Sequence, residues 1–170
     1  MENTPELIIK LSHLEIFSDL DPENEEHYRI FNRLCAILEP VEFAAGEAII
    51  REGETGDSLF ILYSGEVQVR RKTPEGEQFA TANLDATKNV FFGEVALVDR
   101  DTRSASVYAL TLCKTLRLDG KMFKTLCTEE PLLGFFAMNR IACRIASSLR
   151  RANKDILLLY EALLDEVHGE

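Results

Sequence analysis

The spacing of apolar and polar residues changes twice along the chain and divides it into three parts. In the first 40 residues the apolar positions lie three or four residues apart, which is helical spacing. The pattern predicts one helix over residues 5–17, with Leu7, Ile8, Leu11, Leu14 and Ile16 on one face, and a second over about 25–38, with Tyr28, Phe31, Leu34, Cys35 and Leu38 on one face. Residues 19–22 separate them, and Pro40 is expected to end the second helix because proline cannot continue one.

Between residues 41 and 119 short strand-like runs replace the helical spacing. They cover residues 47–51, 58–63, 66–71, 78–84, 104–110 and 112–118. Glycines fall in the breaks between them, where a turn needs backbone freedom: Gly46, Gly53, Gly56, Gly65 and Gly76. Short strands at this spacing predict a small antiparallel, jelly-roll-like β-roll. With helices on either side of it, the fold class is α+β.

Helical spacing returns in residues 120–170. A short helix is expected over about 121–127, a break at Pro131, and one long helix to about residue 167. The long helix carries an apolar seam with alternating steps of three and four: Phe135, Met138, Ala142, Ile145, Leu149, Ala152, Ile156, Leu159 and Leu163. A seam of this length predicts a partner helix, and a homodimer is the simplest one. The basic residues Arg140, Arg144, Arg150, Arg151 and Lys154 are expected to form its polar flanks.

The composition is that of a folded domain and not of a disordered chain. Hydrophobic residues make up 46% and charged residues 28%, and 19 basic against 29 acidic residues give a formal net charge of −10. Such a charge repels nucleic acid and anionic lipid, so neither is an expected partner. The N-terminus, with Glu2 and Glu6, shows no signal peptide and no membrane span. The scattered cysteines, Cys35, Cys113, Cys127 and Cys143, are typical of free thiols in a reducing cytoplasm.

The sequence argues against an enzyme and against a metal site. The three histidines, His13, His27 and His168, all lie outside the β-region, so a histidine-based metal cluster inside the roll is not expected. No serine or cysteine has a plausible neighbouring histidine to activate it as a nucleophile. Glu75 and Glu77 flank Gly76 in an evident turn, where carboxylates are usually solvated.

Residues 92–107, FGEVALVDRDTRSASV, carry the candidate chemistry. Glu94 follows a glycine at the head of a short apolar turn, and Arg103 stands nine residues later. A carboxylate can accept a hydrogen bond from a sugar hydroxyl, and a guanidinium can hold a phosphate with paired donors. Gly93 lets the backbone come close to a ligand. Taken singly, Glu94 could instead cap a helix and Arg103 could form a surface ion pair.

The segment resembles the phosphate-binding cassette of cyclic nucleotide-binding domains. Residues 52–58, EGETGDS, and 59–67, LFILYSGEV, resemble the glycine-punctuated first half of the same fold. Over about residues 10–165 the chain is similar to the sensory domain of catabolite activator and kinase regulatory subunit proteins. The resemblance implies N-terminal helices in residues 1–40, a roll of about eight strands in residues 41–119, and a short plus a long helix in residues 120–170.

The resemblance also implies a ligand site and a function. The phosphate would contact Arg103, Ser104 and the backbone from Gly93 through Val95 to Ala96. Glu94 would bind the ribose, Ala105 would keep its strand slim beside the ligand, and Asn153 would contact the base. Val95 and Leu97 would face the core. Ser104 favours cAMP over cGMP, with no further cofactor. The expected function is a stand-alone, non-catalytic regulatory module that signals through its long helix to an unknown downstream protein.

Two features differ from the family pattern. Thr102 stands where the family usually has proline before the arginine, and Asp99 and Asp101 add negative charge near the expected phosphate. Both features are expected to weaken binding of an anion. The alternative function is a scaffold with the same fold that binds another anionic effector or no nucleotide.

Overall fold

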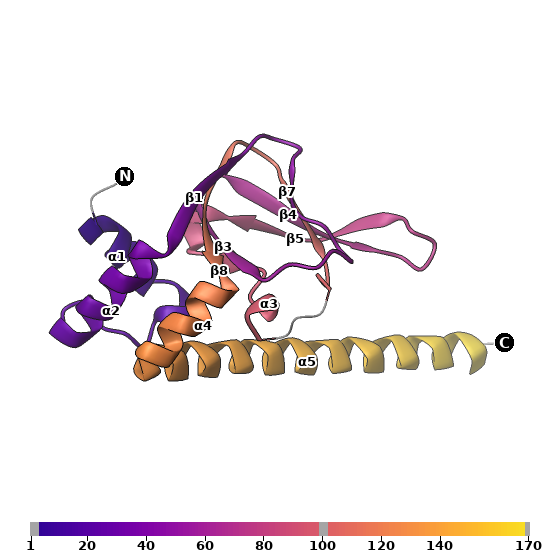
Figure 1. Ribbon diagram of the computed structural model, residues 1–170. Coiled ribbons are helices and arrows are strands. Elements are labelled where there is room, and N and C mark those ends of the chain that lie inside the picture. Colours follow the sequence, from indigo (N-terminus) through magenta and orange to yellow (C-terminus); the bar gives the residue numbers. More distant parts are fainter. Residues whose placement is uncertain (1–3, 99–101, 169–170) are drawn as a thin grey trace.

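The computed structural model describes residues 4–98 and 102–168 (Figure 1). The N-terminal part consists of helix α1 (Thr4–Ser12), the 3₁₀ helix η1 (Glu15–Phe17) and helix α2 (Glu25–Ala36). The Asn24 side chain caps α2 by accepting hydrogen bonds from the backbone N–H groups of Glu26 and His27. The single helix predicted over residues 5–17 is therefore two separate pieces.

The second predicted helix is confirmed over most of its length, but the prediction that Pro40 ends it was wrong. Helix α2 ends at Ala36, and Pro40 lies inside strand β1 (Leu38–Phe43). This strand is at the edge of its sheet, where a residue without an N–H group leaves no ladder hydrogen bond unmade. The β-structure thus begins three residues before the boundary at residue 41.

In the described residues, eight antiparallel strands form two four-stranded sheets, as the resemblance implied. The first sheet has the order β1-β8-β3-β6 and the second β2-β7-β4-β5. The remaining strands are β2 (Ala48–Ile50), β3 (Ser58–Ser64), β4 (Glu66–Lys72), β5 (Gln78–Asp85), β6 (Phe91–Phe92), β7 (Ser106–Ala109) and β8 (Cys113–Asp119). Two short helical turns, η2 (Ala86–Lys88) and α3 (Val95–Val98), flank β6. The sequence pattern missed β1 and β6.

Strand β3 joins two hydrophobic cores. Its side chains alternate between the two faces of the sheet, as in any strand. Leu59 and Ile61 belong to the core shared with the helices, whereas Phe60 and Leu62 belong to the core between the sheets. All four are buried. The roll and the helical layer are therefore built on one common strand.

Two C-terminal helices follow the roll, as predicted. Helix α4 (Gly120–Glu129) is capped by the Asp119 side chain, and helix α5 (Pro131–His168) is 38 residues long. Figure 1 shows α5 running along one side of the molecule beneath α4 and α3. Its first three turns bury Leu133, Ala137 and Ile141, and its distal half is largely exposed. None of the helices in residues 4–98 and 102–168 is long and apolar enough to span a membrane.

The junction between α4 and α5 is clamped to α2. The buried carboxylate of Glu130 accepts hydrogen bonds from Arg29 at 2.7 and 2.9 Å and from Arg33 at 2.7 Å. Hydrogen bonds from Arg33 and Arg29 lower the pKa of Glu130 below its ordinary value.

Two arginines of α5 make contacts that the sequence pattern did not reveal. Arg140 is paired with Asp19, and Arg144 lies 3.8 Å from Glu15. The expectation that these two arginines form the flanks of a dimer seam was therefore wrong, because they hold α5 against the N-terminal part of the same chain.

Candidate functional site

A cavity of about 270 Å³ opens between the second sheet, residues 93–96 and 102–105, and α5. Apolar side chains from five strands form its inner wall, namely Ile50, Val69, Ala82, Leu84, Phe92 and Val107. The remaining lining residues are Gly93, Glu94, Val95, Ala96, Thr102, Arg103, Ser104, Ala105 and Arg144. An apolar wall opposite a few charged groups suits a ligand with an aromatic part and an anionic part.

Arg103 is held in place from behind by the backbone. One guanidinium nitrogen, Nη2, donates a hydrogen bond to Ser58 O at 2.7 Å, and Nη1 donates to Gly93 O at 3.2 Å. The backbone of Arg103 pairs with residues 53 and 54. These two bonds use two of the five guanidinium N–H donors, which leaves donors for an anion. The conformation is fixed before a ligand arrives.

Two glycines make room for this guanidinium. A Cβ atom on Gly56 would lie 3.0 Å from Nε and Nη2 of Arg103. A Cβ atom on Gly93 would lie 2.9 Å from Nη1 of Arg103 and 3.0 Å from Ser58 O, and Gly93 has a φ of +82° that favours glycine. The packing of Arg103 therefore depends on glycine at both positions.

Burial lowers the pKa of Arg103, although the nearby charges of Asp57 and Glu94 act in the opposite direction. An arginine remains charged at neutral pH under these conditions. The cavity thus contains a permanent positive charge within a protein of net charge −10.

Glu94 lies at the cavity and is paired with α5. Its carboxylate Oε1 lies 3.0 Å from Nε of Arg144, and the side chain of Glu94 is only 14% exposed. The Arg144 guanidinium also stacks over the Phe91 ring, 4.4 Å from its centroid. Arg144 lines the cavity, and the sequence reasoning did not assign it to the site. Only its tertiary contacts distinguish it from the other basic residues of α5.

The structure brings most of the predicted site residues to the cavity and corrects one orientation. Gly93, Glu94, Val95, Ala96, Arg103, Ser104 and Ala105 all line it. Leu97 is buried as predicted, but the prediction that Val95 faces the core was wrong. Val95 is 43% exposed, because the short helix α3 turns Ala96 and Leu97 inward instead.

Asn153 does not line the cavity of its own chain. It is exposed on α5, nine residues beyond Arg144, which corresponds to about 13 Å along a helix. The predicted contact of Asn153 with a base remains a prediction. Asp99 and Asp101, which were expected to oppose an anion, lie outside the described residues. Thr102 is described, and it forms a β-bridge with Thr55.

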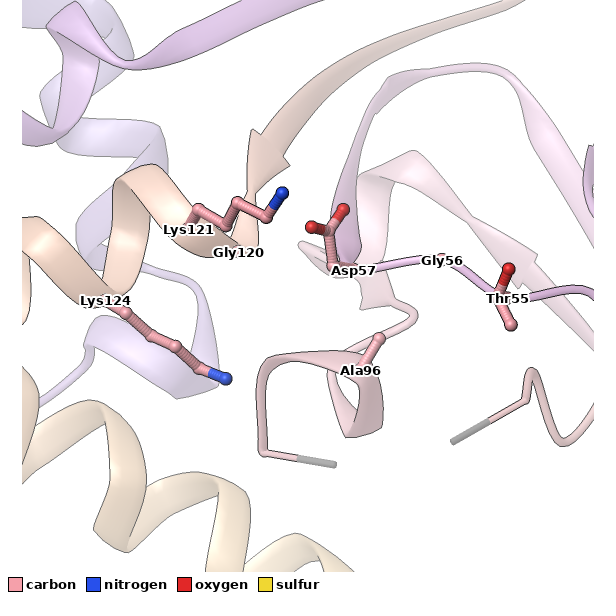
Figure 2. Close-up of a pocket in the computed structure, with 7 residues that line it drawn as sticks. All are labelled: Thr55, Gly56, Asp57, Ala96, Gly120, Lys121 and Lys124. Atoms are coloured by element: carbon pink, nitrogen blue, oxygen red, sulfur yellow. The ribbon is translucent and has the colours of Figure 1, made fainter. Parts of the chain in front are cut away.

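A second hollow of about 320 Å³ lies on the other side of the 55–57 loop, between that loop, α3 and α4 (Figure 2). Figure 2 shows the Lys121 side chain extending toward the Asp57 carboxylate, and Lys124 extending toward α3. Gly120 starts α4 directly against the backbone of Asp57, where a Cβ atom would collide with the Asp57 carbonyl oxygen. Helix α4 is therefore packed against the loop that supports Arg103.

In the part of the chain that the structure describes, no cluster of three or more histidine, cysteine, aspartate or glutamate side chains is arranged to hold a metal ion. The charged side chains at the cavity are those of Arg103, Arg144 and Glu94, and they lie opposite an apolar wall.

Comparisons with known proteins point to one domain family. Residues 40–130 match the family model described as the cyclic nucleotide-binding domain. The cAMP-dependent protein kinase regulatory subunit of Dictyostelium discoideum is 35% identical over 96 residues, which cover 55% of this chain and 29% of that protein. The CRP-like cAMP-activated global transcriptional regulator of Mycobacterium tuberculosis is 28% identical over 119 residues, which cover 70% of this chain and 50% of that protein.

Among solved structures, the catabolite activator protein of Thermus thermophilus is similar, with a TM-score of 0.71 and 26% identity. The similarity covers 85% of this chain and 62% of that chain. This chain spans half or less of the length of the two curated relatives.

Proposed function

The chain belongs to the cyclic nucleotide-binding domain family, and we propose that it is a regulatory module whose cavity binds cAMP in preference to cGMP. The fixed Arg103 guanidinium is the observation that carries this proposal. Its hydrogen bonds to Ser58 O and Gly93 O orient it toward a cavity that Glu94 also lines. A phosphate on Arg103 and a ribose hydroxyl on Glu94 satisfy both groups at once, and the apolar wall accommodates the purine.

The preference for cAMP rests on Ser104 and on the two curated relatives, both of which are named for cAMP. Ser104 is exposed at the cavity, where its hydroxyl can donate to the phosphate. The base requires a polar contact beyond the apolar wall. Ser148 lies one turn past Arg144 on the same face of α5 and could supply this contact within the chain, whereas Asn153 would have to reach the cavity of a second copy.

Arg144 provides the route by which the ligand would signal. The ribose-binding carboxylate is paired with a residue of α5, so a ligand that moves Glu94 also moves α5 or weakens its attachment. Ligand binding would shift the population of α5 positions through this differential contact. The downstream partner that reads the position of α5 is a protein of unknown identity.

We also propose that the module forms a homodimer through the apolar seam of α5. The large seam residues Leu149, Ile156, Leu159 and Leu163 are 59–70% exposed. Exposed apolar residues at heptad spacing are the usual signature of a helix that pairs with another helix. The module acts by binding and not by catalysis in this proposal, and its independence of nucleic acid and of metal stays a prediction.

Titration calorimetry tests the ligand. Wild-type protein is titrated with cAMP, cGMP and the linear monophosphate 5′-AMP, and Arg103→Ala is compared with Arg117→Ala. Arg117 is a matched control, because it is paired with Glu39 of the neighbouring strand β1 and does not line the cavity. Removing an arginine from a buried phosphate contact costs on the order of 2–5 kcal/mol. We therefore expect Arg103→Ala to weaken cAMP binding by more than about tenfold, since each 1.4 kcal/mol is a factor of ten.

Equal affinities of wild type and Arg103→Ala would reject the assignment of the cavity. If the wild type binds none of the three nucleotides, the alternative function, a scaffold that binds another anion or no nucleotide, replaces the proposal.

A further inference from the structure

The distal part of α5 exposes more apolar surface than one partner helix can cover. Seven large apolar side chains within residues 156–167 are 53–70% exposed: Ile156, Leu157, Leu158, Leu159, Tyr160, Leu163 and Val167. Successive residues of an α-helix are rotated by about 100°. On this basis most of these side chains fall on two adjacent faces of the helix.

The first face continues the seam with Leu149, Ile156, Leu159 and Leu163. The second face carries Leu157, Tyr160, Leu164 and Val167, at steps of three, four and three. The second face is turned from the first by about 75° around the helix axis. A two-stranded coiled coil uses one narrow seam, whereas a helix in a four-helix bundle uses a wider apolar face shared by two neighbours. The second face therefore requires a second neighbour.

Charged residues beside the second face indicate what that neighbour is. Arg150, Lys154, Glu161 and Asp165 all lie along the same flank of this face, and all are exposed. The flank is basic in its first half and acidic in its second half. When two such helices pack antiparallel through the second face, their charged flanks lie side by side and run in opposite directions. The basic half of one flank then lies beside the acidic half of the other, so Arg150 faces Asp165 and Lys154 faces Glu161 of the other helix. A parallel pair would place this flank beside apolar residues of the first face.

We propose that residues 150–167 of α5 pack antiparallel against the same residues of a second copy of this chain, crossing between Leu157 and Leu158. If the first face pairs with another copy, as proposed above, the complete assembly contains four chains with a four-helix bundle at the distal ends of α5. This inference does not depend on nucleotide binding.

Sedimentation velocity tests the second face without any nucleotide. Leu157→Gln combined with Tyr160→Gln removes the face, and Leu158→Gln is the matched control, because Leu158 is equally exposed on the opposite side of the helix. We expect the double variant to halve the mass of the assembly and Leu158→Gln to leave it unchanged. A monomeric wild type, or a double variant with the wild-type mass, overturns the proposal.

Charge reversal tests the flank. The pair Arg150→Glu and Lys154→Glu, and separately the pair Glu161→Lys and Asp165→Lys, should each reduce the assembly. Mixing the two variant proteins should restore it. Failure of the mixture to reassemble would contradict the antiparallel contact.

A distance measurement tests the direction. A spin label on the exposed Cys143, with Cys35→Ser and Cys127→Ser, reports where the two helices lie relative to each other. Antiparallel helices that cross between Leu157 and Leu158 place the two labelled positions about 44 Å apart along the axis, at 1.5 Å per residue. Absence of a distance near this value overturns the proposal. A parallel dimer through the seam would add a second, much shorter distance between the two Cys143 labels. If the long distance is the only one found, the antiparallel contact stands and the seam dimer is rejected.

Discussion

The carboxylate of Glu94 lies 3.0 Å from the guanidinium of Arg144, so the residue expected to bind a ribose is already joined to the longest helix of the molecule. The contact links the cavity to α5 without any intermediate residue. The positive charge of Arg144 also offsets the negative charge of Glu94, which would otherwise repel an anionic ligand.

Replacement of Arg144 should separate binding from signalling. We expect Arg144→Gln to weaken cAMP binding by roughly three- to tenfold, on the order of 1 kcal/mol for a partly exposed pair. Hydrogen exchange in residues 120–167 should slow on adding cAMP to the wild type and change little in the variant. Arg151→Gln is the control, since Arg151 is exposed on the same face of α5. Undiminished protection of α5 in Arg144→Gln would rule out this route.

Replacement of Gly93 should affect both stability and binding. Gly93→Ala forces an alanine into a positive φ, which costs about 1–2 kcal/mol, and places its Cβ 2.9 Å from Nη1 of Arg103. Gly76→Ala has a similar φ of +91° but open space around the new Cβ. We expect urea denaturation to show a loss of stability in both variants, larger in Gly93→Ala, and calorimetry to show weaker cAMP binding only in Gly93→Ala. Equal binding by the two variants would contradict the packing described for Arg103.

The Glu130 clamp should make stability depend on pH in the acid range. Hydrogen bonds from Arg33 and Arg29 lower the pKa of Glu130 in the folded protein, so its contribution is present above the ordinary carboxyl pKa and is lost as the pH falls through the folded value. Glu130→Gln should lower the free energy of unfolding at pH 7 by about 1–3 kcal/mol, because hydrogen bonds to a charged group are weakened.

The difference between wild type and Glu130→Gln should remain constant from pH 6 to pH 8 and shrink below about pH 4.5, the region where ordinary glutamates titrate. Urea denaturation at pH 7.5 and pH 3.5 measures both values. If the difference in free energy of unfolding between wild type and Glu130→Gln grows as the pH falls, the role assigned to the ionised Glu130 is contradicted.

The four cysteines should differ in reactivity. Burial raises the pKa of Cys35 and of Cys127 to about 11, and Cys113 is buried with its thiol donating to Glu66 O. Cys143 is exposed. A thiolate is the reactive form, so an aromatic disulfide reagent at pH 8 should modify one thiol rapidly, and Cys143→Ser should abolish that phase. A fast phase that survives in Cys143→Ser would contradict this order.

The sequence identified the residues whose roles are local. Gly93, Glu94 and Arg103 lie within one short segment, and their spacing in the chain sets their spacing in the cavity. Arg144 is 50 residues from Glu94 and looks like any other basic residue of α5, so its role arises only when the fold brings the two together.

The errors in the sequence reading have equally specific causes. Pro40 reads as a helix terminator, but an edge strand tolerates it, and that depends on which strands are neighbours. Val95 is apolar, and for that reason the sequence predicts it to be a core residue. A single helical turn can bury only one side, however, and in α3 that side carries Ala96 and Leu97.

The alternation along β3 limits how the molecule can be divided. Leu59 and Ile61 face the helices, and Leu118 on the neighbouring strand β8 belongs to the same core. A fragment of residues 41–119 would turn this whole apolar face toward water. We expect such a fragment to aggregate and not to bind ligand. The smallest fragment that folds and binds ligand therefore includes the roll together with α1, α2, α4 and the beginning of α5, which form one folding unit.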